Sequence, residues 1–119
     1  MAKIKIKDLR LRAIIGVEEF ERREKQDIII NIELDFNADD AVKTDDLTKT
    51  IDYKALKLEV IALVEKSEFF LVEKLAGEVL GVCLRNPLVN SASVEIDKPH
   101  ALRFAESVSV TLSGNRVNR

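Results

Sequence analysis

Alternating apolar and polar residues along four segments of the chain predict four β-strands. The clearest segment places five apolar side chains on one face: Ile28, Ile30, Ile32, Leu34 and Phe36. In the first segment the alternation begins at Ile4 and changes parity near Lys7-Asp8, so that Leu9 follows the opposite phase. Because strand side chains alternate with a period of two, this change predicts a bulge or bend within one long strand. The last two strands are predicted within residues 92–112.

Two segments in the middle of the chain repeat apolar residues at helical spacing instead. In the first, Asp52 is a typical N-cap residue, and the predicted buried stripe contains Tyr53, Leu56, Val60, Leu63 and Val64. The second runs from about Phe70 to Arg85, with a predicted stripe of Val72, Ala76, Val79, Leu80 and Cys83. The order strand, strand, helix, helix, strand, strand predicts an α+β fold, with both helices on one face of a four-stranded antiparallel sheet.

The predicted sheet is small, and its edge strands are long. An exposed edge presents unpaired N–H and C=O groups that can pair with another chain. Joining these edges to neighbouring subunits in a closed barrel would satisfy them, so we expect a ring-shaped homo-oligomer.

Composition narrows the class of protein. A chain of 119 residues with 46% hydrophobic residues is expected to form one domain over residues 1–119, with a frayed tail from about Gly114. The net charge is −2 with both signs interspersed, which argues against nucleic acid as a partner. No apolar run is long enough to span a membrane. The single cysteine fits a reducing compartment, and we expect a cytoplasmic protein.

Metal and nucleotide chemistry are not favoured by the sequence. His100 is the only histidine and Cys83 the only cysteine, so the chain offers no cluster of imidazole or thiolate ligands. Its four glycines form no phosphate-binding motif. We therefore expect either chemistry without a metal or cofactor, or binding alone.

Lys98 is the first candidate for chemistry. It continues the apolar face formed by Ala92, Val94 and Ile96, immediately before Pro99. Desolvation at such a position disfavours a charged amine and would let it exchange protons nearer neutrality. A surface lysine that packs its stem and keeps its amine in water explains the same pattern. This strand alone favours the surface lysine, and only residues elsewhere in the chain favour a chemical role.

Two further residues lie in the first turns of the predicted helices. Tyr53 could pack its ring while its hydroxyl reaches a pocket, but the pattern alone favours a purely structural tyrosine. Glu73 lies where the helix dipole favours a carboxylate, and Gly77 one turn later leaves room beside it. The charged residues between Gly16 and Lys25 are predicted to form a loop that is mostly solvated.

Four stretches of the sequence carry a resemblance to a known family. They are Leu9-x-Leu11-x-x-x-Ile15-Gly16-Val17 followed by Glu21 and Gln26, Asp45-Asp46-Leu47 with Thr50-Ile51-Asp52-Tyr53, Leu71-Val72-Glu73-Lys74-Leu75-Ala76, and Lys98-Pro99-x-Ala101-Leu102. Together they resemble dihydroneopterin aldolase and its close relative, dihydroneopterin triphosphate 2′-epimerase. The likeness extends from about Ile4 to Gly114, and residues 7–12 and 94–109 are closer to the epimerase branch.

The resemblance implies a fold, an assembly and a ligand. The fold would be the tunnelling fold, in which four subunits form a barrel and two barrels stack as a homo-octamer. Active sites would lie between adjacent subunits and take a 7,8-dihydropterin, with no cofactor and no metal. The loop from Val17 to Gln26 is more charged than is usual in the aldolases, which bears on specificity for the substrate side chain.

The resemblance also implies roles for six residues. Lys98 would be the catalytic acid/base, Tyr53 of the adjacent subunit would assist proton transfer, and Glu21 would contact the hydroxyls of the substrate side chain. Glu73 would hold the amino group and ring N–H of the pterin. Apolar or backbone contacts with the substrate would come from Ile51 and Val72.

The implied reaction is retro-aldol cleavage of the C1′–C2′ bond of a dihydropterin. Re-addition of the aldehyde fragment through its other face gives the 2′-epimer, and we expect this epimerase activity. The first alternative is a housekeeping aldolase of folate biosynthesis, which releases 6-hydroxymethyl-7,8-dihydropterin and glycolaldehyde. The second is a non-catalytic ring that binds pterins or purines.

Overall fold

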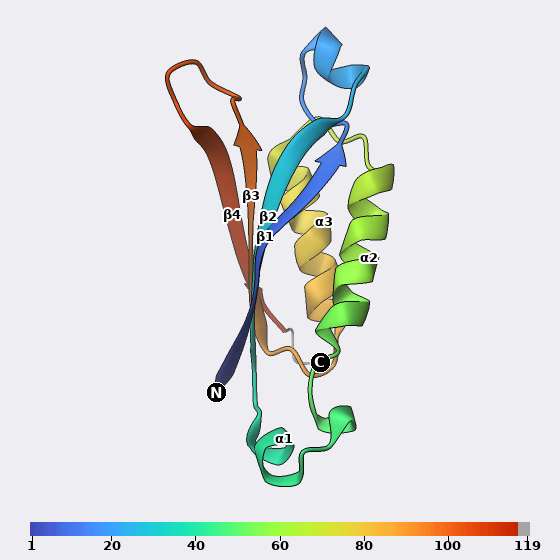
Figure 1. The fold of residues 1–119 in the computed structure, drawn as a ribbon, viewed down its shortest axis with the longest axis vertical. Coiled ribbons are helices and arrows are strands. Elements are labelled where there is room, and N and C mark those ends of the chain that lie inside the picture. The colour runs from blue at the N-terminus through green and yellow to red at the C-terminus, as the bar shows by residue number, and fades with distance from the viewer. Residues whose placement is uncertain (117–119) are drawn as a thin grey trace.

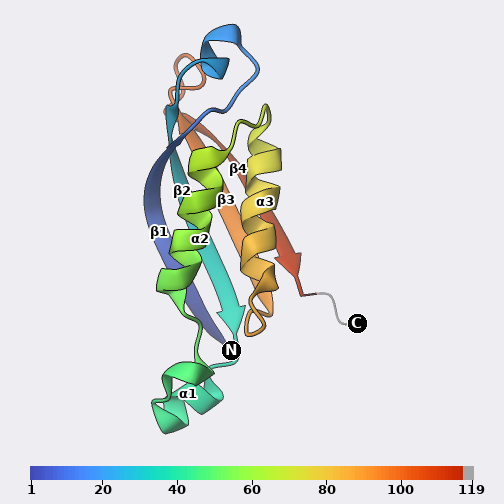
Figure 2. The same ribbon diagram turned by 90° about the vertical axis from the view of Figure 1, so that its right-hand side faces the viewer.

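Four antiparallel strands form one sheet in the order β1-β2-β3-β4, and two helices cover one of its faces (Figures 1 and 2). The computed structural model describes residues 1–116. The strands are β1 (Ala2–Ala13), β2 (Gln26–Phe36), β3 (Ser91–Pro99) and β4 (Ser107–Asn115). The helices are α2 (Tyr53–Lys66) and α3 (Val72–Arg85). The predicted α+β arrangement is therefore confirmed.

Three short helical segments occupy the connections between these elements. The 3₁₀-helix η1 (Glu19–Arg22) lies between β1 and β2. The helix α1 (Asp39–Thr44) and the 3₁₀-helix η2 (Leu47–Lys49) lie between β2 and α2. The connection that contains η1 lies at one end of the molecule, and α1 and η2 lie at the other (Figure 1). The longest dimension of the molecule is 52 Å.

The hydrophobic core lies between the sheet and the two helices. All five apolar residues of the alternating pattern in β2 are buried, and so are Ala92, Val94 and Ile96 of β3. The intervening side chains of the strands point away from the helices. Polar residues fill most of these positions because that face is solvated in the single chain.

A β-bulge divides β1, as the change of parity predicted. The pairing register with β2 shifts between Ile6 and Leu9, and Asp8 adopts a positive φ of 51°. The side chain of Asn31 holds this conformation, because its Oδ1 accepts from the Asp8 N–H at 2.9 Å and its Nδ2 donates to Asp8 Oδ1 at 3.3 Å. The bulge lets apolar side chains on both halves of β1 face the helices.

The helix α2 begins as its sequence indicates but buries a narrower stripe. Asp52 caps it by accepting from the Ala55 N–H at 3.0 Å, and Leu56, Val60 and Val64 are buried. The prediction that Tyr53 belongs to the buried stripe is wrong for the single chain, because this residue is 53% exposed. Helical side chains tilt toward the N-terminus, so the ring of the first residue extends beyond the end of the helix.

The helix α3 begins at Val72, two residues later than expected, and ends at Arg85 as predicted. Its buried residues are Leu75, Ala76, Val79, Val82 and Cys83. Leu75 and Val82 thus take the place of Val72 and Leu80 in the predicted stripe. Leu80 is only half-buried and lies against the β4 backbone at Gly114.

The frayed tail expected from Gly114 does not hold for residues 114–116. Gly114 and Asn115 belong to β4, and the Arg116 N–H donates to Asn90 O at 2.8 Å. Residues 117–119 of the expected tail lie outside the described residues. No helix within residues 1–116 is both long enough and apolar enough to cross a membrane.

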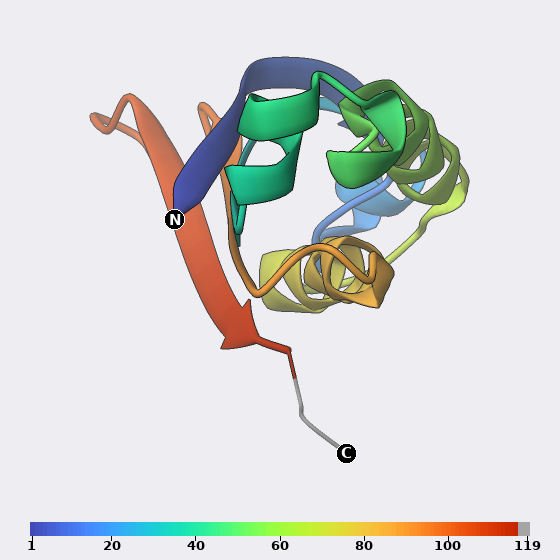
Figure 3. The same ribbon diagram turned by 90° about the horizontal axis from the view of Figure 1, so that it is seen from below.

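Within the described part of the chain, β1 and β4 each pair on one side only. Viewed along the long axis, β4 forms the margin of the sheet and projects away from the helices (Figure 3). Its helix-side residues Val108, Val110 and Leu112 are only half-buried. Both edges therefore remain available for pairing.

Asn31→Ala should destabilise the protein through the bulge. The substitution removes both side-chain hydrogen bonds with Asp8, and because the site is exposed we expect a loss of about 1 kcal/mol in unfolding free energy. Denaturant titration measures this value. Ser93→Ala, on the same face of the sheet but away from the bulge, is the matched control, and equal effects of the two substitutions would contradict the anchoring role of Asn31.

Candidate active site

Lys98 and Glu21 form a nearly buried ion pair where β3 ends. Lys98 Nζ lies 2.7 Å from Glu21 Oε2, and the two side chains are 12% and 10% exposed. Lys98 follows the parity of Ala92, Val94 and Ile96, as the alternation predicted. Its amine is not in bulk water, which disfavours the snorkelling interpretation. The expected apolar surroundings are also incomplete, because a carboxylate faces the amine.

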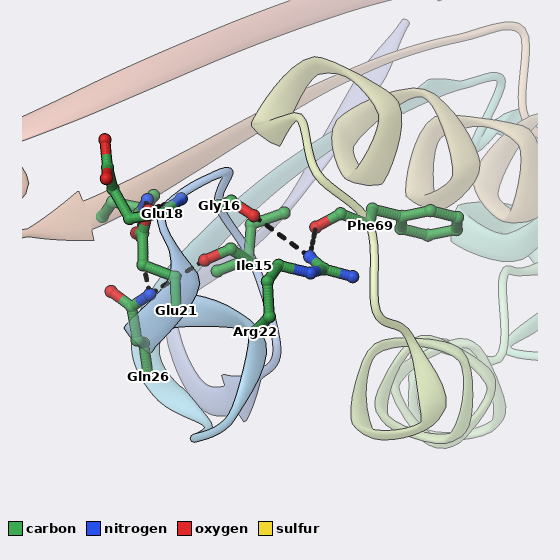
Figure 4. A network of polar contacts seen from close by, with 8 residues as sticks. Ile15, Gly16, Glu18, Glu21, Arg22, Gln26 and Phe69 are labelled. Atoms are coloured by element: carbon green, nitrogen blue, oxygen red, sulfur yellow. Dashed lines mark hydrogen bonds and ion pairs between the residues drawn. The ribbon is translucent and has the colours of Figure 1, made fainter.

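The Glu21 carboxylate accepts two further hydrogen bonds (Figure 4). Gln26 Nε2 donates to Oε2 at 2.9 Å, and the backbone N–H of Glu18 donates to Oε1 at 3.1 Å. Gln26 Nε2 also donates to Ile15 O at 2.8 Å, which ties the start of β2 to the end of β1. Glu21 is therefore oriented from three directions.

Gly16 provides the space that the Glu21 carboxylate occupies. Its φ of +122° suits glycine and strains other residues. A Cβ built at this position would lie 2.2 Å from the carboxyl carbon of Glu21. The glycine is therefore needed both for the turn and for the burial of the carboxylate.

The pKa of Glu21 reflects two opposing effects. Burial raises the pKa. The hydrogen bonds from Lys98, Gln26 and the Glu18 backbone, together with the charge of Lys98, lower it by a larger amount, so that the pKa is about 2 compared with the usual 4.5. Glu21 is thus ionised at neutral pH. It can orient the Lys98 ammonium and accept hydrogen bonds from a hydroxylated ligand, while Lys98 is the group with protons to donate.

Val72 and Glu73 open α3 at the same end of the molecule as this ion pair (Figure 2). Glu73 is exposed and lies in the first turn, where the unpaired N–H groups and the helix dipole favour a carboxylate or an anionic ligand. Outside the α3 backbone, a Cβ at Gly77 would meet only Leu112 among residues 1–116 within 4 Å, at 3.9 Å. The room predicted beside Glu73 is therefore present.

Tyr53 is the first residue of α2 and Ile51 precedes it. The start of α2 lies at the end of the molecule opposite to the start of α3 (Figure 1). Tyr53 and Ile51 help to line a depression of ≈ 320 Å³, together with Leu47, Thr50, Asp52 and Lys54. Ile51 is buried, whereas half of Tyr53 is exposed. Since the 14 residues of α2 span about 21 Å, the Tyr53 side chain does not reach Lys98 of its own chain.

The charged loop between Gly16 and Lys25 is mostly solvated, as expected, with two exceptions. Glu21 is 8% exposed, and the half-buried Arg22 donates to backbone carbonyls of another loop. The alternation of apolar and polar residues predicted the burial of neither, because both belong to an uninterrupted run of charges. Glu21 was singled out only by the family resemblance. The turn glycine before that run was the available signal, since it marks a close approach. Within residues 1–116, no three His, Cys, Asp or Glu side chains are close enough together to hold a metal.

Lowering the pH should weaken folding through Glu21. Its lowered pKa means that the ionised carboxylate stabilises the fold above about pH 4.5, and this contribution is lost as the pH falls through about 2. The shift corresponds to at most about 3 kcal/mol. Denaturant titrations should show a difference between wild type and Glu21→Gln that shrinks between pH 5 and pH 2, whereas exposed Glu24→Gln should show little difference throughout. A difference independent of pH would contradict the assignment.

A family model described as dihydroneopterin aldolase matches residues 4–113. The Pseudomonas aeruginosa dihydroneopterin triphosphate 2′-epimerase is 47% identical, over 98% of this chain and 94% of its own length. The Escherichia coli protein of the same name is 44% identical, over 95% of this chain and 94% of its own length.

Among solved structures, the E. coli dihydroneopterin aldolase in complex with neopterin has a TM-score of 0.91 and 28% identity. The match covers 97% of this chain and 100% of that one. With one family model spanning nearly the whole sequence and relatives above 40% identity over almost their full length, the chain belongs to the dihydroneopterin aldolase family.

Proposed function

We propose that the chain is a dihydroneopterin triphosphate 2′-epimerase of folate and tetrahydropterin metabolism that also has aldolase activity. The observation that carries this proposal is the Lys98–Glu21 pair, a proton donor held against an ionised carboxylate at the end of the sheet where α3 begins. The epimerase is favoured over a housekeeping aldolase because the relatives at 44% and 47% identity carry the epimerase name.

The reaction would begin with removal of the proton from the substrate 2′-hydroxyl. The C1′–C2′ bond breaks as C2′ becomes a carbonyl, and the electron pair moves into the dihydropterin ring while N5 takes a proton. The ring is its own electron sink, so we propose that neither a metal nor a cofactor takes part. If the aldehyde turns over and re-adds, C2′ is inverted. If it leaves and C1′ is protonated, the outcome is aldolase cleavage.

The side chains divide this work according to their chemistry. The Lys98 ammonium would exchange protons with the reacting centre, and Glu21 would hold Lys98 and accept from the side-chain hydroxyls. A positioned acid or base of this kind typically contributes roughly 10²- to 10⁴-fold. Glu73 would accept from the pterin amino group and ring N–H as a bidentate carboxylate, with Val72 in apolar or backbone contact.

We further propose that the site is completed by a neighbouring subunit in a closed ring, with two four-subunit rings stacked as an octamer. Three features support this arrangement. The edges of β1 and β4 are available, β4 carries half-buried valines on its helix side, and Tyr53 with Ile51 lies about one helix length from Lys98. Each chain would then contribute to two sites, with its Lys98 in one site and its Tyr53 in another.

The direct test is incubation with 7,8-dihydroneopterin triphosphate and, separately, with the free triol, followed by reverse-phase chromatography. The proposal predicts a 2′-epimer and a smaller amount of 6-hydroxymethyl-7,8-dihydropterin, both unchanged by a metal chelator. Cleavage product alone would favour the housekeeping aldolase. Retention of pterin without turnover would favour the binding protein.

Lys98→Ala should lower the rates of epimerisation and cleavage together, by at least about 10²-fold, because the two reactions share the bond-breaking step. Both products are followed in one reaction mixture, beside equilibrium binding of a non-reactive pterin, which should change little. Lys57→Ala, on the exposed side of α2, is the matched control. Loss of one activity alone would show that the reactions do not share this intermediate.

Mixing two inactive variants should restore activity if the site is shared. In assemblies formed from equal amounts of Lys98→Ala and Tyr53→Ala chains, about one site in four would combine an intact Lys98 with an intact Tyr53 of a neighbour. The mixture, refolded together, should therefore recover about a quarter of wild-type activity per site. Activity no higher than the average of the two separate variants, or light scattering that shows a monomer, would contradict the shared site.

A further inference from the structure

Arg22 connects two loops that are far apart in the sequence. Its guanidinium Nη1 donates to Gly16 O and to Phe69 O, each at 3.1 Å (Figure 4). Nη2 donates to Glu68 O. The guanidinium carbon also lies 4.1 Å from the centroid of the Phe70 ring. One side chain thus bridges the loop after β1 and the connection between α2 and α3.

These contacts suit arginine and no other side chain. The guanidinium carries five N–H donors in a fixed planar arrangement, which lets it serve three carbonyls while its face stacks on an aromatic ring. A backbone hydrogen bond from the Gly16 N–H to Phe69 O, at 3.4 Å, reinforces the same junction. Arg22 is therefore built into the junction, unlike the neighbouring Arg23, which is exposed and pairs with Glu19.

The two loops that Arg22 joins lead directly to the two halves of the candidate site. Glu21 precedes Arg22 and packs against Gly16, whose carbonyl Arg22 binds. On the other side, Phe69 and Phe70 precede the first turn of α3, which carries Val72 and Glu73. The Arg22 contacts consequently fix where the Lys98–Glu21 pair lies relative to the start of α3.

We propose that Arg22 is a positioning residue that sets the separation between the group acting on the substrate side chain and the group that holds the pterin ring. This inference rests on the proposed function, in which Glu21 with Lys98 meets the side chain and Glu73 meets the ring. Reaction rates are sensitive to such spacing, since a misplacement of about 1 Å can cost about 10²-fold. In this proposal Arg22 acts through its contacts with the Gly16, Glu68 and Phe69 carbonyls, and not through contact with the substrate.

The test compares Arg22→Leu, Arg22→Lys and the control Arg23→Leu. For each, kcat and KM are measured with 7,8-dihydroneopterin triphosphate, and calorimetry measures the affinity for pterin itself, which has no side chain. Hydrogen–deuterium exchange is followed in peptides covering residues 14–18 and 67–71. All measurements are made below the melting temperature of each variant.

Arg22→Leu should lower kcat/KM by about 10- to 100-fold and speed exchange in both peptides, while pterin affinity stays within about twofold. Arg22→Lys should fall between wild type and Arg22→Leu, because an ammonium has three donors but no plane to stack. Arg23→Leu should match wild type in every measurement.

Unchanged kcat/KM in Arg22→Leu would overturn the inference, and so would equal losses for substrate turnover and pterin affinity, since these would indicate general disruption. A wild-type protein without turnover would instead refute the proposed function, and the two failures are therefore distinguishable.

Discussion

The burial of one carboxylate constrains much of this molecule. Glu21 occupies the space that a side chain at Gly16 would fill, and it accepts from Lys98, Gln26 and the Glu18 backbone. A buried carboxylate without partners would be strongly destabilising, so the loop must hold these three donors in place. The β1–β2 connection, the end of β3 and the loop before α3 are therefore joined through a small group of polar contacts, and the candidate chemistry lies within that group.

A second constraint is length. The strands and helices run between two distant ends of the molecule, so each chain carries chemical groups at both ends that it cannot bring together alone. If the site combines groups from both ends, as proposed, it is complete only in an assembly. The proposed catalytic chemistry would then depend on pairing at the β1 and β4 edges, each of which pairs on one side only within residues 1–116. The length of the folded chain and the proposed assembly are therefore linked.

The sequence predicted most of the fold because the buried residues follow the spacing of apolar residues along the strands and helices. The bulge in β1 appeared as a change of parity, and Lys98 appeared on the apolar side of β3 for the same reason. The burial of Tyr53 was predicted wrongly because helical spacing shows which face of the helix a residue occupies. It does not show whether a neighbouring element extends far enough to cover that residue. The bridging role of Arg22 was missed because its partners are backbone carbonyls, two of them 46 and 47 residues away along the chain. Such contacts leave no pattern in the side-chain chemistry of the sequence. The family resemblance named both Glu21 and Lys98, but it did not predict that they form an ion pair.

The bulge at Asp8 also determines the charge of one sheet edge. Because the register shifts between Ile6 and Leu9, both halves of β1 place cations on the face away from the helices: Lys3, Lys5, Arg10 and Arg12, of which three pair with acidic residues of β2. The same face of β4 carries only uncharged side chains: Ser107, Ser109, Thr111, Ser113 and Asn115. Pairing two β1 edges would place like charges opposite one another, which is destabilising, whereas pairing β1 with β4 would not. The single residue inserted at the bulge thus makes the two edges of the sheet different in charge. This difference favours pairing of β1 with β4 over pairing of two β1 edges.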